Sequence, residues 1–300
     1  MNYPAAITRE KAHRGAVILA HYYQPPEIQA AADLVGDSLQ LAQAAQRLEA
    51  EVIVICGVKF MAESAKILNP ERTVLMPEPE AGCPMADMVD AAGLKKLKAM
   101  HPSAVVVTYV NSSAEVKAES DVCCTSSNAW QVINSLPADR EIIFCPDQNL
   151  GANIMKASGR KMILWSGYCP IHHQVTNEDI NRLQKLHPKA PVVVHPECPP
   201  PVVTMADAVL STAGILDFVK ANAAMEFIIG TERGLITVLE KQNPGKRFYL
   251  AKEELYCPDM KMITLEKLHR SLTDMVTPVE VPEEISQKAR LALERMTALG

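Results

Sequence analysis

Three of the eight cysteines in this chain occur in the same short pattern. Cys83, Cys169 and Cys257 each precede a proline and follow a short apolar run and a loop, as in KMILWSGYCPIHH around Cys169. The positions 83, 169 and 257 are separated by intervals of 86 and 88 residues. Near-equal spacing of one small pattern predicts a structural unit that is used three times, with each copy bringing one thiol to a shared point.

Thiols from three distant segments suit an iron–sulfur cluster better than a structural zinc site. Structural zinc is usually bound by a closed set of four ligands with paired CxxC spacing. A [4Fe–4S] cluster held by three protein thiolates would keep one iron open. An open iron can act as a Lewis acid toward a carboxylate or a hydroxyl group. A cluster that only carries electrons more usually has all four positions closed, so the pattern favours chemistry at the cluster.

The other cysteines are predicted to be structural. Cys56 and Cys145 lie within apolar strands, Cys123 and Cys124 flank a helix start, and Cys198 follows the HPE motif. Free cysteine commonly packs as a small hydrophobe. Eight cysteines in 300 residues are too sparse for a disulfide scaffold, and a reducing compartment would keep them as thiols.

Polar residues follow a buried strand in each predicted copy, and a serine-led helix follows that strand. The strands are AVILAHYY (16–23), SAVVVTYVNSS (103–113) and APVVVHPECPP (190–200). The first polar strand-end residue precedes the serine by 17, 17 and 16 residues and precedes the cysteine by 62, 60 and 62 residues. This agreement supports three repeats. The residues are His21, Tyr23 and Ser38 in the first copy, Tyr109, Asn111 and Ser126 in the second, and His195, Glu197 and Ser211 in the third.

The alternation of strands and helices predicts an α/β fold. We expect three pseudo-threefold-related αβα domains, each a small parallel sheet with helices on both faces. The predicted domains are residues 1–86 together with a C-terminal helix at 270–300, then 87–173, then 174–269. The closing segment PEEISQKARLALERMTALG is amphipathic and is expected to pack back onto one of the copies.

All of the polar motifs lie at the carboxyl ends of predicted strands, where open parallel sheets bind ligands. The three strand ends and three helix starts would surround one cavity, and backbone N–H groups there would bind small, multiply anionic molecules. The net charge of −5 and the absence of a basic run argue against nucleic acid or an anionic membrane as partner. The N-terminal stretch lacks the apolar core of a signal peptide, and no apolar run approaches the roughly 20 residues of a membrane span, which predicts a cytoplasmic protein.

Five separated motifs then carry a resemblance to a known family. HYYQ with GDSLQLA, TYVNSSAEVKA with CCTSSN, WSGYCPIHH, VVVHPECPP with STAG, and YCPDMKM occur in the order found in quinolinate synthases, across essentially the whole length. The resemblance implies condensation of iminoaspartate with dihydroxyacetone phosphate to quinolinate, with loss of phosphate and water, in NAD biosynthesis. It also implies three similar αβα domains with a [4Fe–4S] cluster at their junction, and a functional link to L-aspartate oxidase or dehydrogenase.

Carried onto this sequence, the resemblance assigns ligands and substrate contacts. The implied cluster ligands are Cys83, Cys169 and Cys257. The implied substrate-handling residues are His21, Tyr23, Ser38, Tyr109, Asn111, Ser126, His195, Glu197, Ser211 and Thr212. We expect Ser211, Thr212 and His195 to hold one anionic group, Ser38, Ser126 and His21 to hold another, and the open iron to take the third.

Proton transfers in such a reaction need acids and bases. Tyr23 and Glu197 are the expected acid–base partners, and His195 is grouped with them as catalytic. His172 or His173 is expected to be a further proton carrier, without a choice between them. Some members of the family have a cysteine three residues before the last ligand. Here that position is Glu254, so a thiol–disulfide switch is not expected.

Two other functions remain compatible with the residues. One is a different iron–sulfur lyase or dehydratase, which would share the open iron but not the ring closure. The other is a cluster-based redox or iron sensor that binds a partner through a domain face. Turnover of iminoaspartate and dihydroxyacetone phosphate to quinolinate separates the synthase from both.

Overall fold

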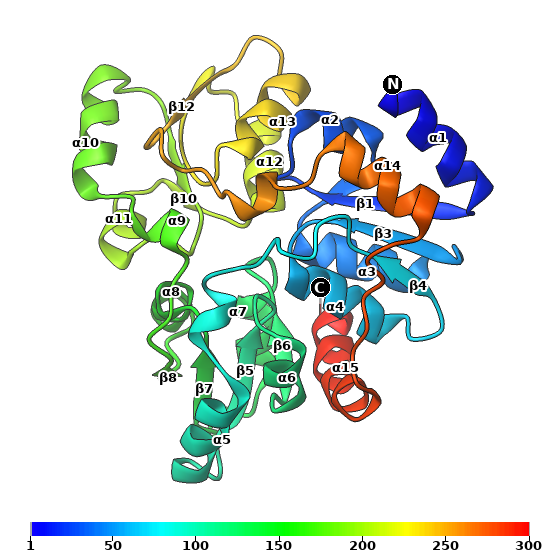
Figure 1. Ribbon diagram of the computed structural model, residues 1–300. Helices are drawn as coiled ribbons and strands as arrows, with labels where there is room; N and C mark the ends of the chain where they lie inside the picture. Colours follow the sequence, from blue (N-terminus) through cyan, green and yellow to red (C-terminus); the bar gives the residue numbers. More distant parts are fainter. Residues whose placement is uncertain (1, 300) are drawn as a thin grey trace.

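Short runs of valine, isoleucine and leucine form three parallel sheets. The structure is a computed structural model that describes residues 2–299, and within them the strands form three four-stranded sheets with the same strand order. Figure 1 shows the three resulting units side by side around a central junction. The expected fold class, α/β with three similar αβα units, is confirmed, and all pairings within the sheets are parallel.

Each unit repeats the element order β–α–β–α–β–α–β. The first unit consists of β1 (Ala16–His21), α2 (Pro26–Ala31), β2 (Leu34–Gly36), α3 (Ser38–Arg47), β3 (Val52–Cys56), α4 (Lys59–Leu68) and β4 (Thr73–Leu75). The second consists of β5 (Val105–Tyr109), α6 (Ala114–Ala118), β6 (Val122–Cys124), α7 (Ala129–Ser135), β7 (Ile142–Cys145), α8 (Gln148–Ser158) and β8 (Ile163–Leu164). The third consists of β9 (Val192–Val194), α11 (Pro200–Thr204), β10 (Ala208–Val209), α12 (Thr212–Ala221), β11 (Glu226–Gly230), α13 (Gly234–Gln242) and β12 (Arg247–Leu250).

Further helices precede and follow these units. They are α1 (Tyr3–His13), α5 (Ala91–Met100) and α10 (Asn177–Leu186) before the units, and the short helices η1 (Ala86–Met88), α9 (Pro170–His173) and η2 (Asp259–Lys261) just after the three cysteines. The chain ends with α14 (Leu265–Asp274) and α15 (Glu283–Ala298). The described helices include none that is both long and apolar enough to cross a membrane.

The sequence pattern missed one strand and one helix in each unit. The strands β2, β6 and β10 are only two or three residues long, so they carry no alternation that a pattern could detect. A repeated aspartate marks them. Asp33, Asp121 and Asp207 each stand just before the short strand, and each accepts the backbone N–H of a residue 15 positions earlier in the neighbouring strand at 2.8 Å.

The C-terminal helices return to the first two units. Helix α14 packs against α1, and the segment after it bonds β4 through the Val279 N–H and the Val74 carbonyl at 2.8 Å. Helix α15, red in Figure 1, lies between the first and second units and packs against α4 and α6. Its buried side includes Ala289, Leu293 and Met296. The closing helix was expected to pack onto one of the copies, and it contacts two of them. The domain boundaries at 86, 173 and 269 stay a prediction.

Candidate active site

The carboxyl ends of the central strands meet at one cavity of about 240 Å³. It is lined by residues from all three units, including His21 at the end of β1, Tyr109 at the end of β5 and His195 just after β9. Of the residues assigned from the sequence, the cavity is lined by His21, Tyr23, Ser38, Tyr109, Asn111, Ser126, His195, Glu197, Thr212, Cys83, Cys169 and Cys257, whereas Ser211 is not among its lining residues. The repeat register therefore predicted which side chains converge.

The three cysteines of the repeated pattern differ from the other five. Cys83, Cys169 and Cys257 are partly exposed and line the cavity, and the remaining five are buried. The prediction that those five pack within the core is confirmed. Each cavity thiol accepts the backbone N–H of the residue three positions later, at the start of a short helix. Three equivalent turns therefore hold the three sulfurs.

Burial disfavours the ionised form of all three thiols. It raises the pKa of Cys83 to about 12 and that of Cys257 to about 11. Burial and the charge of Glu197 raise the pKa of Cys169 well above its usual value. Cys83 also interacts electrostatically with both Cys257 and Cys169. A cation at their common point would reverse these shifts, because thiolate is the form that ligates metal.

His21 and His195 present the same ring nitrogen to the cavity. Nδ1 of His21 accepts the backbone N–H of Tyr23 at 3.1 Å, and Nδ1 of His195 accepts that of Glu197 at 3.3 Å. Burial lowers the pKa of both imidazoles to about 3. A neutral imidazole with an accepting Nδ1 carries its proton on Nε2. Both side chains are therefore uncharged donors, and Nε2 of His195 lies 3.2 Å from the hydroxyl of Ser126.

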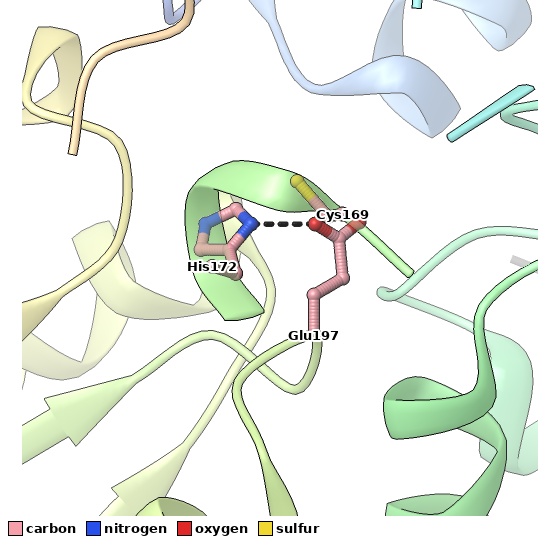
Figure 2. Close-up of side chains that lie close together, drawn as sticks. All are labelled: Cys169, His172 and Glu197. Atoms are coloured by element: carbon pink, nitrogen blue, oxygen red, sulfur yellow. Dashed lines mark hydrogen bonds and ion pairs between the residues drawn. The ribbon is translucent and has the colours of Figure 1, made fainter. Parts of the chain in front are cut away.

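Glu197 is a buried carboxylate with a donor on each oxygen. Tyr109 donates its phenolic proton to Oε1 at 2.5 Å, and Nδ1 of His172 lies 2.5 Å from Oε2. Figure 2 shows the His172–Glu197 contact, with Cys169 at the start of the helix that carries His172. Burial alone would raise the pKa of Glu197, but the imidazoles of His195 and His172 and these hydrogen bonds outweigh it and hold the pKa below its ordinary value.

A threonine that the sequence analysis missed connects Tyr23 to His172. The hydroxyl of Thr231 lies 2.8 Å from the phenolic oxygen of Tyr23 and 3.0 Å from Nε2 of His172, and Thr231 is completely buried. Thr212 bonds the same phenol at 3.0 Å. Burial raises the pKa of Tyr23 well above its usual value, so the phenol keeps its proton. Thr231 follows β11, whereas the polar residues predicted from the sequence follow the first strand of each unit.

The three serines differ in their local structure. Helix α3 begins at Ser38 and is capped by Asp37, whose Oδ1 accepts the N–H of Gln40 at 2.9 Å. Ser211 caps α12 by accepting the N–H of Gly214 at 3.2 Å, and the next residue, Thr212, is the one that lines the cavity.

The expectation that a helix starts at Ser126 is wrong. Helix α7 begins at Ala129, and Ser126 lies in the turn before it. The side chain of Asn128 causes the delay, because its Oδ1 accepts both the N–H and the hydroxyl of Thr125, at 2.8 and 3.1 Å, and closes a turn. Ser126 still lines the cavity from that turn.

The two histidines after Cys169 have different environments. His172 is buried and lines the cavity, where its ring stacks on that of His195 with centroids 4.5 Å apart. His173 is not among the lining residues. Its Nδ1 bonds the side-chain amide of Asn149 at 2.9 Å, and its ring packs on Tyr168. The geometry therefore selects His172 as the histidine that can exchange protons with the cavity.

Two overlapping sets of side chains have the chemistry to hold a metal. Cys169, His172 and Glu197 offer one ligand atom each, all within 4.8 Å of one another. The three cysteines offer soft thiolates from three directions around one cavity. Thiolates are the ligands that iron–sulfur clusters take, and backbone N–H bonds to the sulfurs are typical of such sites. The cysteine set therefore fits a cluster, while both nitrogens of His172 already have partners.

The fold and the cavity define a three-unit α/β enzyme whose site lies where the units meet. The family model described as quinolinate synthetase A protein matches residues 5–298, and the chain belongs to that family. It is 54% identical over 289 residues to quinolinate synthase 1 of Methanosarcina acetivorans, covering 96% of this chain and 95% of the relative. It is 55% identical over 290 residues to the quinolinate synthase of Dehalococcoides mccartyi, covering 97% and 96%. The quinolinate synthase of Geobacter metallireducens is 52% identical over 293 residues, covering 98% and 96%.

Proposed function

We propose that this protein is a quinolinate synthase that condenses iminoaspartate with dihydroxyacetone phosphate, with loss of phosphate and water, in NAD biosynthesis. The observation that carries the proposal is the convergence of three thiols, two neutral imidazoles and a buried chain of acid–base groups on one cavity. Near-full-length identity above 50% to proteins named for this activity supports it. The fold supplies the cavity by setting three strand ends against one another.

The anionic groups of the two substrates would be bound mainly by neutral donors. The Nε2–H groups of His21 and His195 and the hydroxyls of Ser38, Ser126 and Thr212 belong to residues that line the cavity. We infer that His21, Ser38 and Ser126 hold one anionic group and that Thr212 and His195 hold another, with Ser126 and His195 in contact at 3.2 Å. Neutral donors bind carboxylates and phosphate while permitting release of product, since no fixed cation pairs with the anion. Ser211 acts behind this set by capping the helix on which Thr212 stands.

Proton transfer would run along one hydrogen-bonded chain. Ionised Glu197 accepts from Tyr109 and from Nδ1–H of His172, so a neutral His172 accepts the Thr231 hydroxyl on Nε2. Thr231 then accepts from Tyr23. As the Tyr23 phenol takes a proton from substrate, it can pass its own proton through Thr231 to His172, where Glu197 stabilises the resulting imidazolium, and the phenol stays neutral. Tyr23 is thus the group that meets substrate, and Glu197 acts on it through His172.

The cofactor that we propose is a [4Fe–4S] cluster held by Cys83, Cys169 and Cys257. When bound, it would supply an iron with an open position that acts as a Lewis acid toward a carboxylate or a departing hydroxyl. We further propose a cytoplasmic enzyme supplied with iminoaspartate by L-aspartate oxidase or dehydrogenase, with domains at residues 1–86 plus 270–300, 87–173 and 174–269.

The test is turnover and composition measured on one oxygen-free preparation. Protein purified anaerobically should contain about four irons and four sulfides per chain and should form quinolinate from iminoaspartate and dihydroxyacetone phosphate. A full iron count without quinolinate would favour a different lyase or a sensor. Quinolinate formation by iron-free protein would refute the cluster and keep the reaction.

A further inference from the structure

Two buried acidic residues that were not predicted from the sequence lie next to the loops that carry two of the cysteines, and one of them, Glu232, also lines the cavity. Asp147 follows β7 and Glu232 follows β11, and their residues are 0% and 1% exposed. Oδ2 of Asp147 accepts the backbone N–H of Cys169 at 3.2 Å. Oε1 of Glu232 accepts the backbone N–H of Cys257 at 3.1 Å. In two units, therefore, a carboxyl group after the third strand holds the backbone of the cysteine itself.

In the first unit, a carboxyl group from another unit binds the backbone of the cysteine loop. The matching position after β3 is Val58, which offers no oxygen. There the backbone N–H of Gly82, next to Cys83, bonds Oδ1 of Asp259 at 3.0 Å, and Asp259 belongs to the third unit. Each cysteine loop thus has one backbone N–H bound by a carboxyl oxygen.

Asp147 is itself fixed on both sides. Its Oδ1 caps α8 by accepting the N–H of Leu150 at 2.8 Å. The next residue, Gln148, donates its N–H to the carbonyl of Gly167 at 2.8 Å, two residues before the cysteine. The Cys169 loop is therefore attached to the start of α8 by a backbone bond and by the Asp147 side chain.

Glu232 holds a second group in addition to the Cys257 loop. It forms an ion pair with Lys261 at 3.0 Å, and the Lys261 ammonium donates to the carbonyl of Tyr23. The absence of a side chain at Gly234 permits this approach, since a Cβ there would lie 2.7 Å from Oε2 of Glu232 and 3.1 Å from Cα of Tyr23. Glu232 therefore connects a cysteine of the third unit with the tyrosine of the first.

We propose that Asp147 and Glu232 are positioning residues, which fix the sulfurs of Cys169 and Cys257 by binding the backbone of each cysteine. The inference rests on the proposed function, because the sulfurs need a fixed spacing when they share a cluster. Neither residue has to touch the cluster. Glu232 in addition sets the position of Tyr23 through Lys261.

The test compares Asp147→Asn and Glu232→Gln in the full-length chain. Asparagine keeps the Oδ1 acceptor for Leu150 and places an amide N–H₂ against the Cys169 N–H. Glutamine has one side-chain oxygen, whereas the two oxygens of Glu232 bind the backbone N–H groups of Cys257 and Gly234 and the ammonium group of Lys261. Asp207→Asn is the matched control, since it makes the same change in a carboxyl group whose 2.8 Å bond to a backbone N–H uses one oxygen, which asparagine retains, and lies at the opposite end of a strand.

The first readout is alkylation of each cysteine, followed by peptide mass spectrometry after iron has been removed with a chelator. Loss of a hydrogen bond to a carboxyl group weakens the loop so that it opens about tenfold more often. Asp147→Asn should therefore speed alkylation of Cys169 about tenfold, and Glu232→Gln that of Cys257, while Cys83 keeps its wild-type rate. Equal acceleration of all three cysteines, or none, would overturn the proposal.

The second readout is iron retention by freshly purified protein held with a chelator under anaerobic conditions. Both variants should lose iron several-fold faster than wild type and Asp207→Asn. Variants that retain iron as wild type does would contradict the positioning role. If the wild type itself holds no iron, the proposed cofactor fails, and the alkylation pattern still decides whether these residues position the cysteines.

Discussion

The phenolic oxygen of Tyr109, at the end of β5, lies 2.5 Å from Oε1 of Glu197, beyond the end of β9. The contact joins the second unit to the third inside the cavity. It gives one oxygen of a buried carboxylate its donor, while His172 serves the other. The charge at Glu197, which follows β9 of the third unit, is thus stabilised by Tyr109 of the second unit and by His172 of the short helix that follows that unit.

Tyr109→Phe should lower both stability and activity. The variant keeps the ring packing but leaves Oε1 of Glu197 without this donor. A hydrogen bond to a charged group contributes about 1.5–3 kcal/mol, so the free energy of unfolding should fall by about that amount in urea titrations. Tyr249→Phe is the control, since its hydroxyl bonds Glu226 near β12 at 3.1 Å. If the Tyr109→Phe protein were as stable as this control, the Tyr109 hydroxyl would not stabilise the buried charge of Glu197.

His21 should make the protein sensitive to acid. Burial lowers its pKa from 6.5 to about 3, so between these values the unfolded chain binds the proton that the folded chain rejects. The contribution of neutral His21 to the free energy of unfolding is fully present above pH 6.5 and is lost as the pH falls toward 3. The free energy of unfolding should therefore decrease by about 2 kcal/mol per such histidine between pH 7 and pH 5.

Denaturation curves of His21→Gln at the two pH values measure this contribution. The variant should show a smaller loss of stability between pH 7 and pH 5 than wild type, because its side chain cannot take up a proton. His13→Gln, at a side chain that is 70% exposed, should behave as wild type. An identical pH dependence in wild type and His21→Gln would rule out the contribution.

Cys169→Ser should abolish the cluster. The variant should lack iron, the brown absorbance near 400 nm that is roughly typical of thiolate-ligated [4Fe–4S] clusters, and activity. Cys56→Ala is the matched control, since Cys56 is completely buried in β3 and faces an apolar cluster of the first unit. The control should keep its iron even if it unfolds more easily. A colourless Cys169→Ser protein that still makes quinolinate would exclude a catalytic cluster.

The residues at the ends of the first strands could be predicted from the sequence. The residues that hydrogen-bond to the cysteine loops and to Tyr23 could not. His21, Tyr109 and His195 stand at one register position in a repeated pattern, and parallel strands must bring their ends to one edge. Asp147 and Thr231 follow the third strands, where Val58 and Gly57 break the pattern in the first unit. Their roles depend on contacts with loops of other segments, and no local spacing encodes such contacts.

The turn at Ser126 shows a second limit. Serine-led helices in the first and third units predicted a helix start there, and the side chain of Asn128 delays it by binding Thr125. Asn128 also donates to the carbonyl of Met296 at 2.9 Å. The helix start is therefore displaced by a local turn between Thr125 and Asn128, and Asn128 also contacts the C-terminal helix, which has no counterpart among the repeats.

Thr231→Val should test whether protons reach Tyr23 through the chain to His172. Valine has the shape of threonine without the hydroxyl, so it breaks the bonds of 2.8 and 3.0 Å to Tyr23 and His172. Tyr23 keeps its bond to Thr212, and the iron content should be unchanged. Because general acid–base steps contribute about 10²–10⁴-fold, we expect kcat to fall by at least about tenfold with little change in KM.

Thr231→Ser and Tyr23→Phe complete this experiment. Serine restores the hydroxyl and should recover most of the lost kcat, whereas a purely steric role of the threonine methyl would not be rescued. Tyr23→Phe alone should reduce kcat more strongly than Thr231→Val, because it removes the group at the cavity. If the two residues act along one chain, the double variant should be no slower than Tyr23→Phe. Additive losses in the double variant would mean that Thr231 and Tyr23 act independently and that the hydrogen-bonded chain does not carry the proton.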